Sequence, residues 1–316
     1  MEKPLSAAIA VRDLVKKYGD VEAVGGVSFE VETGTIFGLL GRNGAGKTTT
    51  LETCVGLTRP TSGEVRVLGL DPSRRRDFQA LRKRIGVQLQ TTSLPEKAKA
   101  REILQLYAAY YGVRVDLPEI AARVGLEDKL DRLVGTMSGG EQQRLALALA
   151  FLHDPEVVFL DEPTAGMDAF GRRILWGEVT RLRDAGKALV LTTHYIEEAE
   201  RLCDEICVVQ AGKVVARGTP AALVAQYGGD ACIDFSARGF TLIPELDRLG
   251  RWTHQAESWA LAVHGDAGHA LGAIVAHANT LSVAIDELDL HRPNLEDAFI
   301  AITGESLDDE KPSAAA

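Results

Sequence analysis

The sequence predicts an α/β fold with a mostly parallel sheet, followed by a small α+β domain. Three short apolar runs, at 36–40, 157–160 and 188–191, have the unbroken hydrophobicity of strands that are buried on both faces of a sheet. Helix-forming sequence precedes the second and third runs, which is the alternation typical of parallel β–α units. Beyond Pro220 the strands become shorter and the pattern changes, which indicates a second domain.

The larger domain is expected to span residues 8–224. A strand at 24–31 precedes the first buried run, which leads directly into a glycine-rich loop and a helix that reaches residue 57. Before the second buried run lies a mainly helical stretch, at about 91–140, in which Gly112 is placed to end a helix. Because this stretch interrupts the alternation of strands, it is predicted to be an inserted helical subdomain.

Residues 225–304 are predicted to form the small α+β domain. Its elements are three short strands, at 232–235, 259–263 and 281–285, and a helix near 268–278. A last helix is expected to begin after Asn294 as its N-cap, with Asp297 three residues later, and to stop at Gly304. Residues 305–316 are expected to be a disordered tail.

The composition limits the classes of protein to which the chain can belong. The chain has 316 residues, which is enough for about two domains. It has 35 Lys and Arg against 45 Asp and Glu, a formal net charge of −10, so no nucleic-acid partner is expected. No run approaches the ~18 apolar residues of a membrane span, and the four scattered cysteines do not suggest a disulfide scaffold. Any role at a membrane is therefore expected to depend on a partner.

The strongest motif is the glycine-rich loop between the first buried run and its helix. It fits G-x-x-x-x-G-K-[ST], which in this context predicts a phosphate-binding P-loop. The glycines let backbone N–H groups and the helix N-terminus point at phosphate oxygens, while Lys47 adds a positive charge and Thr48 offers a hydroxyl to Mg²⁺. The nucleotide-binding residues expected in this segment are Gly41, Asn43, Gly44, Ala45, Gly46, Lys47, Thr48 and Thr49.

Two carboxylates, Asp161 and Glu162, follow the second buried run. The carboxyl ends of strands form the ligand crevice of an open α/β sheet. There Asp161 can hold Mg²⁺, directly or through water, and Glu162 can accept a proton from an attacking water. A solvated turn is the alternative for an isolated pair, but the P-loop upstream favours the catalytic interpretation.

The segment Ser138-Gly139-Gly140-Glu141 begins another helix. Ser138 and Glu141 have the spacing of a capping box, which is a structural role. The cap does not require the two glycines, which expose backbone N–H groups and let an anion approach closely. This helix terminus is therefore a second candidate phosphate-binding site.

Taken together, the motifs resemble those of the ATP-binding cassette (ABC) ATPases. Residues 137–144 are similar to the LSGGQ signature, with Met for Leu and Glu for Gln. The resemblance implies ATP and Mg²⁺ as cofactors. It also implies that Tyr18 stacks on adenine, that Asp168 belongs to the D-loop, and that His194 is the switch histidine at the γ-phosphate.

The resemblance also identifies a Q-loop glutamine that contacts Mg²⁺ or the lytic water. Strand alternation cannot choose between Gln88 and Gln90, but the spacing of the family selects Gln90. The residues expected to be catalytic are Glu162, His194 and Gln90, and those expected to bind Mg²⁺ are Thr48, Gln90 and Asp161. Outside the P-loop, the residues expected to bind nucleotide are Tyr18, Ser138, Gly139, Gly140 and Asp168.

As a whole, the resemblance implies the ATP-hydrolysing subunit of a membrane exporter. The ending Asn294 to Phe299, followed by Thr303-Gly304, resembles that of bacterial drug and antibiotic exporters. The expected partners are a second copy of the chain, as a homodimer in the ATP-bound state, and a separate integral-membrane permease. The chain itself is expected to be peripheral, at the cytoplasmic face of the cell membrane, through this permease. Two alternatives stay open: an import subunit and, less favoured, a soluble ABC ATPase that acts on ribosomes or DNA.

Two other features are assigned structural roles. Cys203 and Cys207 are four residues apart, but no further cysteine lies nearby, which favours buried thiols over a metal site. The basic residues at 74–76 and 82–84 are interpreted as a solvated helix face.

Overall fold

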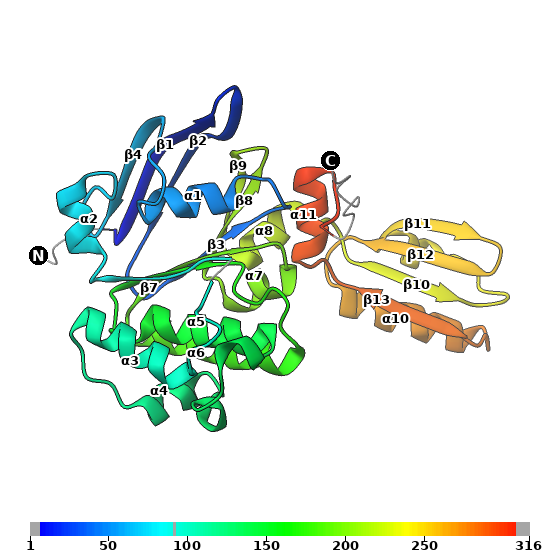
Figure 1. Cartoon of the computed structure of the whole chain (residues 1–316). Coiled ribbons are helices and arrows are strands. Elements are labelled where there is room, and N and C mark those ends of the chain that lie inside the picture. The colour runs from blue at the N-terminus through cyan, green and yellow to red at the C-terminus, as the bar shows by residue number, and fades with distance from the viewer. Residues whose placement is uncertain (1–6, 91–92, 308–316) are drawn as a thin grey trace, which may run out of the picture. The chain divides into compact units, whose positions relative to one another are not determined.

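The computed structural model describes residues 7–90 and 93–307, which separate into two compact units. The first unit runs to Pro220 and the second covers Ala221–Ser306 (Figure 1). Each unit has a hydrophobic core of its own. None of the helices in these ranges has both the length and the hydropathy needed to cross a bilayer.

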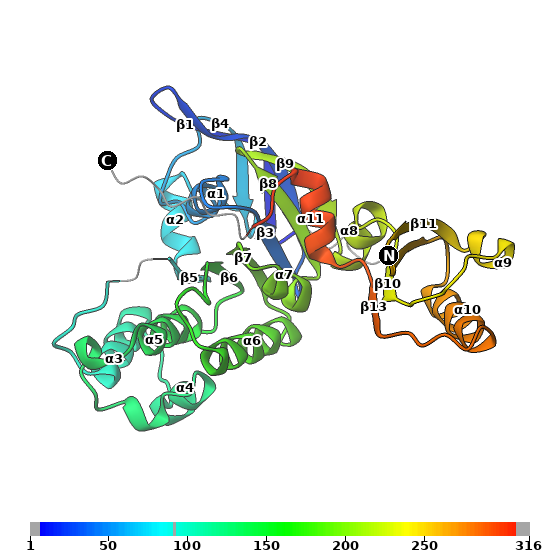
Figure 2. The ribbon, with the colours of Figure 1, turned by 90° about the vertical axis from the view of Figure 1, so that its right-hand side faces the viewer.

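A six-stranded sheet forms the centre of the first unit (Figure 2). Its strands, in the spatial order β5-β6-β7-β3-β8-β9, are β3 (Ile36–Leu40), β5 (Ile85–Gln88), β6 (Val157–Asp161), β7 (Ala188–Thr193), β8 (Glu205–Gln210) and β9 (Lys213–Gly218). All neighbouring strands are parallel except β8 and β9. Every residue of β3, β6 and β7 is buried, as their apolar runs predict. The α/β fold class is therefore confirmed.

A second, antiparallel sheet belongs to the same unit. It has the order β2-β1-β4 and consists of β1 (Ile9–Tyr18), β2 (Val21–Val31) and β4 (Ser62–Val67). Only part of β2 is predicted by the sequence, because β1 and β4 mix exposed polar residues with buried ones. Its core is continuous with one face of the central sheet, where Phe29 stacks on Phe37 with ring centroids 4.7 Å apart.

Helices cover the central sheet. They are α1 (Lys47–Cys54), α2 (Arg75–Leu81), α5 (Gly139–Phe151), α6 (Ala169–Asp184) and α7 (Ile196–Leu202). Figures 1 and 2 show α5 and α6 on the side of the sheet opposite to α1. The helix after the P-loop ends at Cys54, earlier than expected, because Gly56 adopts a positive φ of 76°.

The stretch expected to be an inserted helical subdomain contains α3 (Ala100–Tyr111), α4 (Leu117–Arg123) and two short 3₁₀ helices, Glu127–Lys129 and Val134–Thr136. Residues 91 and 92 of the expected range lie outside the described residues. Gly112 ends α3 with a φ of 72°, as predicted. Arg123 of α4 pairs with Glu178 of α6, and its guanidinium lies 3.9 Å from the ring centroid of Phe151 in α5.

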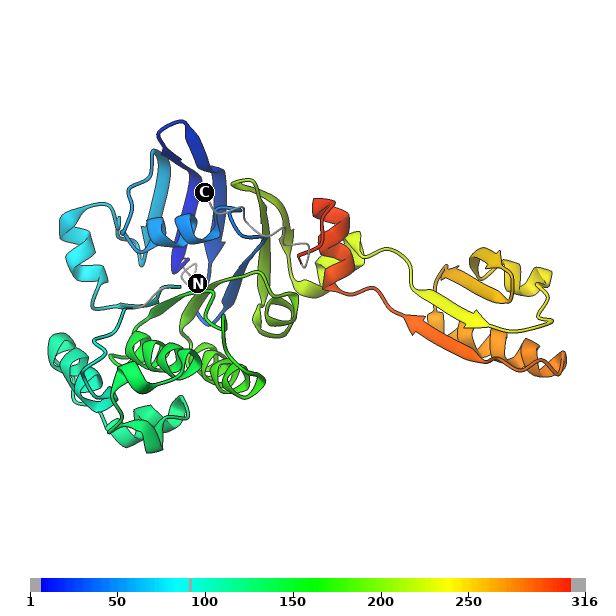
Figure 3. The same cartoon turned by 45° about the vertical axis from the view of Figure 1, so that its right-hand side comes forward.

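The second unit contains a four-stranded antiparallel sheet in the order β11-β12-β10-β13, with α10 against one face (Figure 3). Its elements are α8 (Pro220–Tyr227), β10 (Cys232–Ser236), α9 (Pro244–Asp247), β11 (Gly250–Gln255), β12 (Ser258–Val263), α10 (Ala267–Thr280), β13 (Glu287–His291) and α11 (Leu295–Thr303). Fully buried Ile233, Leu261 and Ile274 join the sheet to α10. Asn294 and Asp297 form the predicted capping box of α11, and Gly304 ends it.

One predicted strand of this unit is wrong. Residues 281–285 are not a strand, because Leu281 caps α10 and Ser282 takes a left-handed φ of 56° that interrupts an extended chain. Val283 and Ile285 still pack on the core from an irregular segment, so their spacing imitates a strand. The fourth strand of the sheet, besides β10, β11 and β12, is β13. The tail expected at 305–316 lies mostly outside the described residues.

Gly86 of β5 has no space for a side chain, since a Cβ there would lie 1.9 Å from the carbonyl oxygen of Ala150 in α5. We expect Gly86→Ala to lower the free energy of unfolding by about 3 kcal/mol, because β5 must move away from α5. The control is Gly177→Ala, at an exposed position of α6 with open space around it, which should raise the free energy of unfolding by about 0.5–1 kcal/mol. Urea unfolding measures both, and equal stabilities would contradict the packing of β5 on α5.

Candidate active site

The P-loop connects the end of β3 to the start of α1. Gly46 precedes the helix with a φ of 101°, and a Cβ at this position would lie 2.4 Å from the carbonyl oxygen of Ala23. Only glycine fits this combination of conformation and close approach. Because glycine supplies no side-chain cap, the first N–H groups of α1 are oriented to receive an anion.

Lys47 is held inside this loop. Its side chain is 3% exposed, and Nζ donates to the carbonyl oxygens of Gly41 at 2.7 Å and Arg42 at 3.2 Å. Nζ also lies 3.3 Å from Oε1 of Glu162. The loop carbonyls thus fix a buried positive charge next to the carboxylate that follows β6.

Asp161 ends β6 and faces the P-loop helix. Its Oδ1 accepts hydrogen bonds from Thr48 Oγ1 at 3.1 Å and Thr192 Oγ1 at 2.5 Å. Its Oδ2 is buried and has no hydrogen-bond partner within the described residues. Burial raises the pKa of Asp161, and the two hydroxyl groups act against this rise. An unsatisfied carboxylate oxygen beside a threonine hydroxyl is a donor set that fits Mg²⁺.

Glu162 has an unusual backbone conformation that directs its carboxylate. Its φ is 45°, and its N–H donates to the carbonyl oxygen and the hydroxyl of Thr192, at 3.1 and 3.0 Å. Oε2 accepts a hydrogen bond from Gln90 Nε2 at 3.1 Å, and Oε1 lies 3.3 Å from both Lys47 Nζ and His194 Nδ1. Three predicted site residues therefore converge on this carboxylate.

These neighbours keep Glu162 ionised. Burial raises the pKa of Glu162, but the contact with His194 and the charge of Lys47 outweigh burial, so its pKa lies below the usual glutamate range. The contact of His194 is one of proximity, because Nδ1 is not aligned as a hydrogen-bond donor. An ionised carboxylate at neutral pH is the form that can accept a proton.

Gln88 and Gln90, which strand alternation cannot distinguish, have different positions and partners in the structure. β5 ends at Gln88, so the expectation that Gln88 and Gln90 lie on one strand face is wrong. Gln88 is buried and donates to Gln143 of α5 at 2.8 Å, whereas Gln90 reaches Glu162. Gln143 in turn donates to the carbonyl oxygen of Gln90 at 3.4 Å. It therefore links α5 to the Q-loop residue, a role that its polar neighbours in the sequence do not reveal.

Thr192 is a second residue that sequence reasoning misses. It pairs with Asp161 across the sheet, and its hydroxyl and carbonyl groups bind both Asp161 and Glu162. The available signal is its position, because it is a polar residue at the end of an apolar run beside a predicted site residue.

The remaining predicted residues lie apart from this cluster. The hydrogen bonds described for Ser138 join it to Glu141 in a capping box, and those of Asp168 cap α6. Gly140 lies beside the D-loop, since a Cβ there would be 3.8 Å from Cα of Met167, whereas a Cβ at Gly139 would have no atom within 4 Å. Tyr18 ends β1 with 48% of its surface exposed, and Lys16 Nζ lies 4.7 Å from its ring centroid. An exposed ring of this kind is available for stacking.

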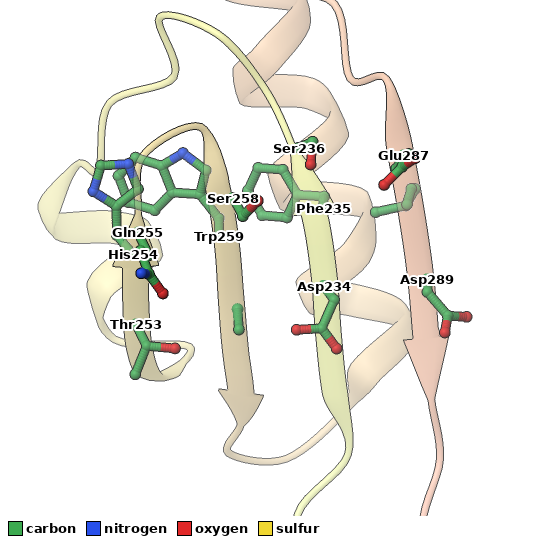
Figure 4. Close-up of a pocket in the computed structure, with 12 residues that line it drawn as sticks. Asp234, Phe235, Ser236, Thr253, His254, Gln255, Ser258, Trp259, Glu287 and Asp289 are labelled. Atoms are coloured by element: carbon green, nitrogen blue, oxygen red, sulfur yellow. The ribbon is translucent and has the colours of Figure 1, made fainter.

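A cavity of about 700 Å³ lies elsewhere, on the open face of the sheet in the second unit. Figure 4 shows Asp234, Asp289 and Thr253 on this face, and Glu287 also lines it. Its carboxylates repel a triphosphate, and it provides neither a lysine nor a helix N-terminus. The cluster around Glu162 is therefore the better nucleotide site.

Comparisons with known proteins agree with this geometry. Residues 24–165 match the family model described as ABC transporter. The chain is 37% identical to the Nod factor export ATP-binding protein I of Burkholderia lata, over 96% of this chain and 99% of that protein. It is 36% identical to the protein of the same name from Rhizobium meliloti, over 96% and 90% of the two chains.

Solved structures match the first unit. One titled as the ATP-binding subunit of an ABC transporter has a TM-score of 0.64 and 29% identity, over 69% of this chain and 92% of that chain. An ATP-binding cassette of an ABC transporter in an ADP conformation has a TM-score of 0.59 and 21% identity, over 68% and 91%. The second likeness concerns the fold alone.

Proposed function

The chain belongs to the ABC transporter family, as its motifs predict, and we propose that it is the ATP-hydrolysing subunit of an exporter with a separate membrane-spanning partner. The observation that carries the proposal is the convergence of Lys47, Gln90 and His194 on Glu162 at the mouth of the P-loop. Relatives named as export ATP-binding proteins match nearly the whole chain, which favours export over import and over action on ribosomes or DNA.

In the proposed reaction the P-loop N–H groups and Lys47 hold the β- and γ-phosphates. Lys47 Nζ lies 3.3 Å from Oε1 of Glu162. A triphosphate competes for this lysine, which releases Glu162 to accept a proton from the attacking water. Gln90 and His194 flank the same carboxylate and are placed to orient the water and the γ-phosphate.

Mg²⁺ is part of the proposal, because a buried oxygen of Asp161, next to Thr48, has no hydrogen-bond partner among residues 7–90 and 93–307. Thr48, Asp161 and, from the Q-loop, Gln90 would hold the ion. When bound it neutralises charge on the β- and γ-phosphates. Thr192 keeps Asp161 oriented for this purpose through the hydrogen bond to Oδ1.

The first test is Glu162→Gln, which preserves the shape of the side chain but replaces one acceptor oxygen by an NH₂ group and cannot take a proton from water. We expect the variant to bind MgATP with an affinity within a few-fold of wild type, and its turnover to fall by about 10²–10⁴-fold. Steady-state ATPase assays and nucleotide binding measure the two effects. Turnover close to wild type would move the general base to another residue, and His194 would be the next candidate.

We also propose that the active form is a homodimer, peripheral to the cytoplasmic face of the membrane, with each ATP between two chains. The helices α1 and α5 both begin in a glycine-rich segment, and of these two N-termini it is that of α1 that lies at the Glu162 cluster. A triphosphate is stabilised by a helix N-terminus on each side of it. In a twofold dimer the α5 terminus of the partner subunit supplies the second one.

Mixed dimers test this arrangement. Lys47→Ala and Ser138→Arg are each expected to be inactive alone, the first by loss of the phosphate charge and the second by obstruction of the α5 terminus. In a mixed dimer one site carries both defects and the other carries neither, so mixing should restore up to about half of the wild-type ATPase activity. The control mixes two Lys47→Ala chains that carry different tags. A single-site mutant dimer must be shown to turn over independently; if it does and mixing restores nothing, the site lies within one chain.

The membrane partner is proposed to bind an apolar groove of about 390 Å³ between α1, α2, β5, α3 and α5. Leu57, Phe78, Val87, Tyr107, Tyr111 and Leu149 are among the residues that line it. Leu57 is 54% exposed, an unusual position for a leucine beside an apolar hollow. The groove is adjacent to the end of β5, from which the chain continues to Gln90, so an occupant can sense the state of the site.

Leu57→Asp should weaken this contact because it places a charge in an apolar interface. With the proposed membrane-spanning partner co-expressed, we expect co-purification and vesicle transport to fall by about tenfold, while the ATPase activity of the isolated chain stays within about twofold of wild type. Val215→Asp, an exposed apolar position on β9, is the matched control. Full co-purification and transport by Leu57→Asp would exclude the groove as the docking surface.

A further inference from the structure

A buried carboxylate that the proposed reaction does not use lies behind the site. Glu198 belongs to α7, four residues after His194, and is only 1% exposed. Its Oε2 accepts a hydrogen bond from Thr164 Oγ1 at 3.4 Å, and Thr164 follows Glu162 by two residues. Glu198 therefore connects the turn after the catalytic carboxylate to the helix after the switch histidine.

Glu198 is surrounded by side chains that can donate hydrogen bonds. The hydroxyls of Thr193 and Thr164 and the indole N–H of Trp176 all act to stabilise its ionised form. Glu198 Oε1 and Trp176 Nε1 are both buried, but neither makes a hydrogen bond of ordinary geometry within the described residues, so Trp176 acts on Glu198 by proximity. Glu198 lies on α7 and Trp176 on the adjacent helix α6. A small movement of one helix would let the unused N–H of Trp176 donate to the unused Oε1 of Glu198.

We propose that Glu198 is a positioning residue for ATP hydrolysis, which holds the Glu162-to-Thr164 turn and the His194 turn in one arrangement. This inference rests on the roles proposed above for Glu162 and His194. Glu198 does not contact the reacting groups. It acts through Thr164 on one side and through Thr193 and the start of α7 on the other.

The protonation of Glu198 provides a readout for this role. Burial raises the pKa of Glu198 to about 7, although Thr193, Thr164, Trp176 and the charge of His194 lower it. The other titratable neighbour is Cys203, whose pKa burial raises well above its usual value, so this thiol stays protonated near neutrality. Arg201 lies over the Trp176 ring, 4.8 Å from its centroid.

The direction of the pH effect follows from the donors. The ionised carboxylate can accept from every neighbour, whereas the protonated form turns one oxygen into a donor, and a threonine hydroxyl that accepts from it no longer donates to Glu198. The Glu162-to-Thr164 turn and the His194 turn are therefore held most firmly when Glu198 is ionised, which is above pH 7. Turnover should rise as the pH increases through the pKa of Glu198.

Glu198→Gln imitates the protonated form at every pH. We expect the ratio of wild-type to variant kcat to rise from about 1 at pH 6 to about 5 at pH 8, with KM for ATP within about twofold throughout. Taking the ratio removes the effect of groups that titrate in both proteins. The matched control is Glu197→Gln, an exposed glutamate on the same helix, whose ratio should stay near 1. A ratio that stays flat near 1 for a folded Glu198→Gln would overturn the proposal.

Thr164→Val supplies a second test that leaves Glu198 in place. Loss of a donor raises the pKa of Glu198, so the midpoint of the rise in kcat should move upward by about 0.5–1 pH unit. An unchanged midpoint would contradict the inference even if Glu198→Gln does not fold.

If Glu162→Gln retains normal turnover, the proposed catalytic roles fail. If it is inactive while both Glu198→Gln and Thr164→Val behave as wild type, only the positioning role fails.

Discussion

The parallel pairing of β3, β6 and β7 is the constraint on which the site depends. In this register Leu40 lies beside Thr193, and Asp161 lies beside Thr192, so the three strands end at the same level. The residue that follows each strand therefore enters one small volume. The P-loop lies more than a hundred residues before Glu162 and His194, and the three meet because their strands are aligned. The apolar faces that bury these strands thus also set the distances between the polar groups at their ends.

Lys47 and Glu162 are oppositely charged and both almost fully buried, with Nζ 3.3 Å from Oε1. The cost of removing an unpaired ion from water is several kcal/mol, so each charge is stabilised by its proximity to the other. The loop carbonyls of Gly41 and Arg42 also hold Lys47, and His194 lies beside Glu162. In the proposed reaction a triphosphate shares Lys47 with Glu162, so nucleotide in the P-loop also changes the surroundings of the proposed base.

Much of this site can be predicted from sequence, because its residues directly follow unbroken apolar runs. Lys47, Asp161 and Glu162 belong to this class, and their motif spacing restricts the chemistry. Gln90 is different: it lies beyond the end of β5, where alternation no longer applies, and only the family spacing identifies it. Thr192 and Glu198 have no motif of their own in this reasoning, since their roles arise from neighbours across the sheet or on another helix. The false strand at 281–285 has a related cause, because two apolar residues can reach a core without being extended.

The capping box at the start of α5 has a consequence for how two chains separate. In a single chain Glu141 Oε2 accepts from the N–H of Ser138 at 2.7 Å, and Ser138 Oγ accepts from the N–H of Glu141 at 3.2 Å. In the dimer proposed above, a phosphate of the partner's nucleotide would bring further negative charge to this terminus. The capping box is made within one chain and does not depend on that phosphate. The start of α5 would therefore keep its helical form when the proposed dimer separates, and the chains could meet again without any refolding of the helix.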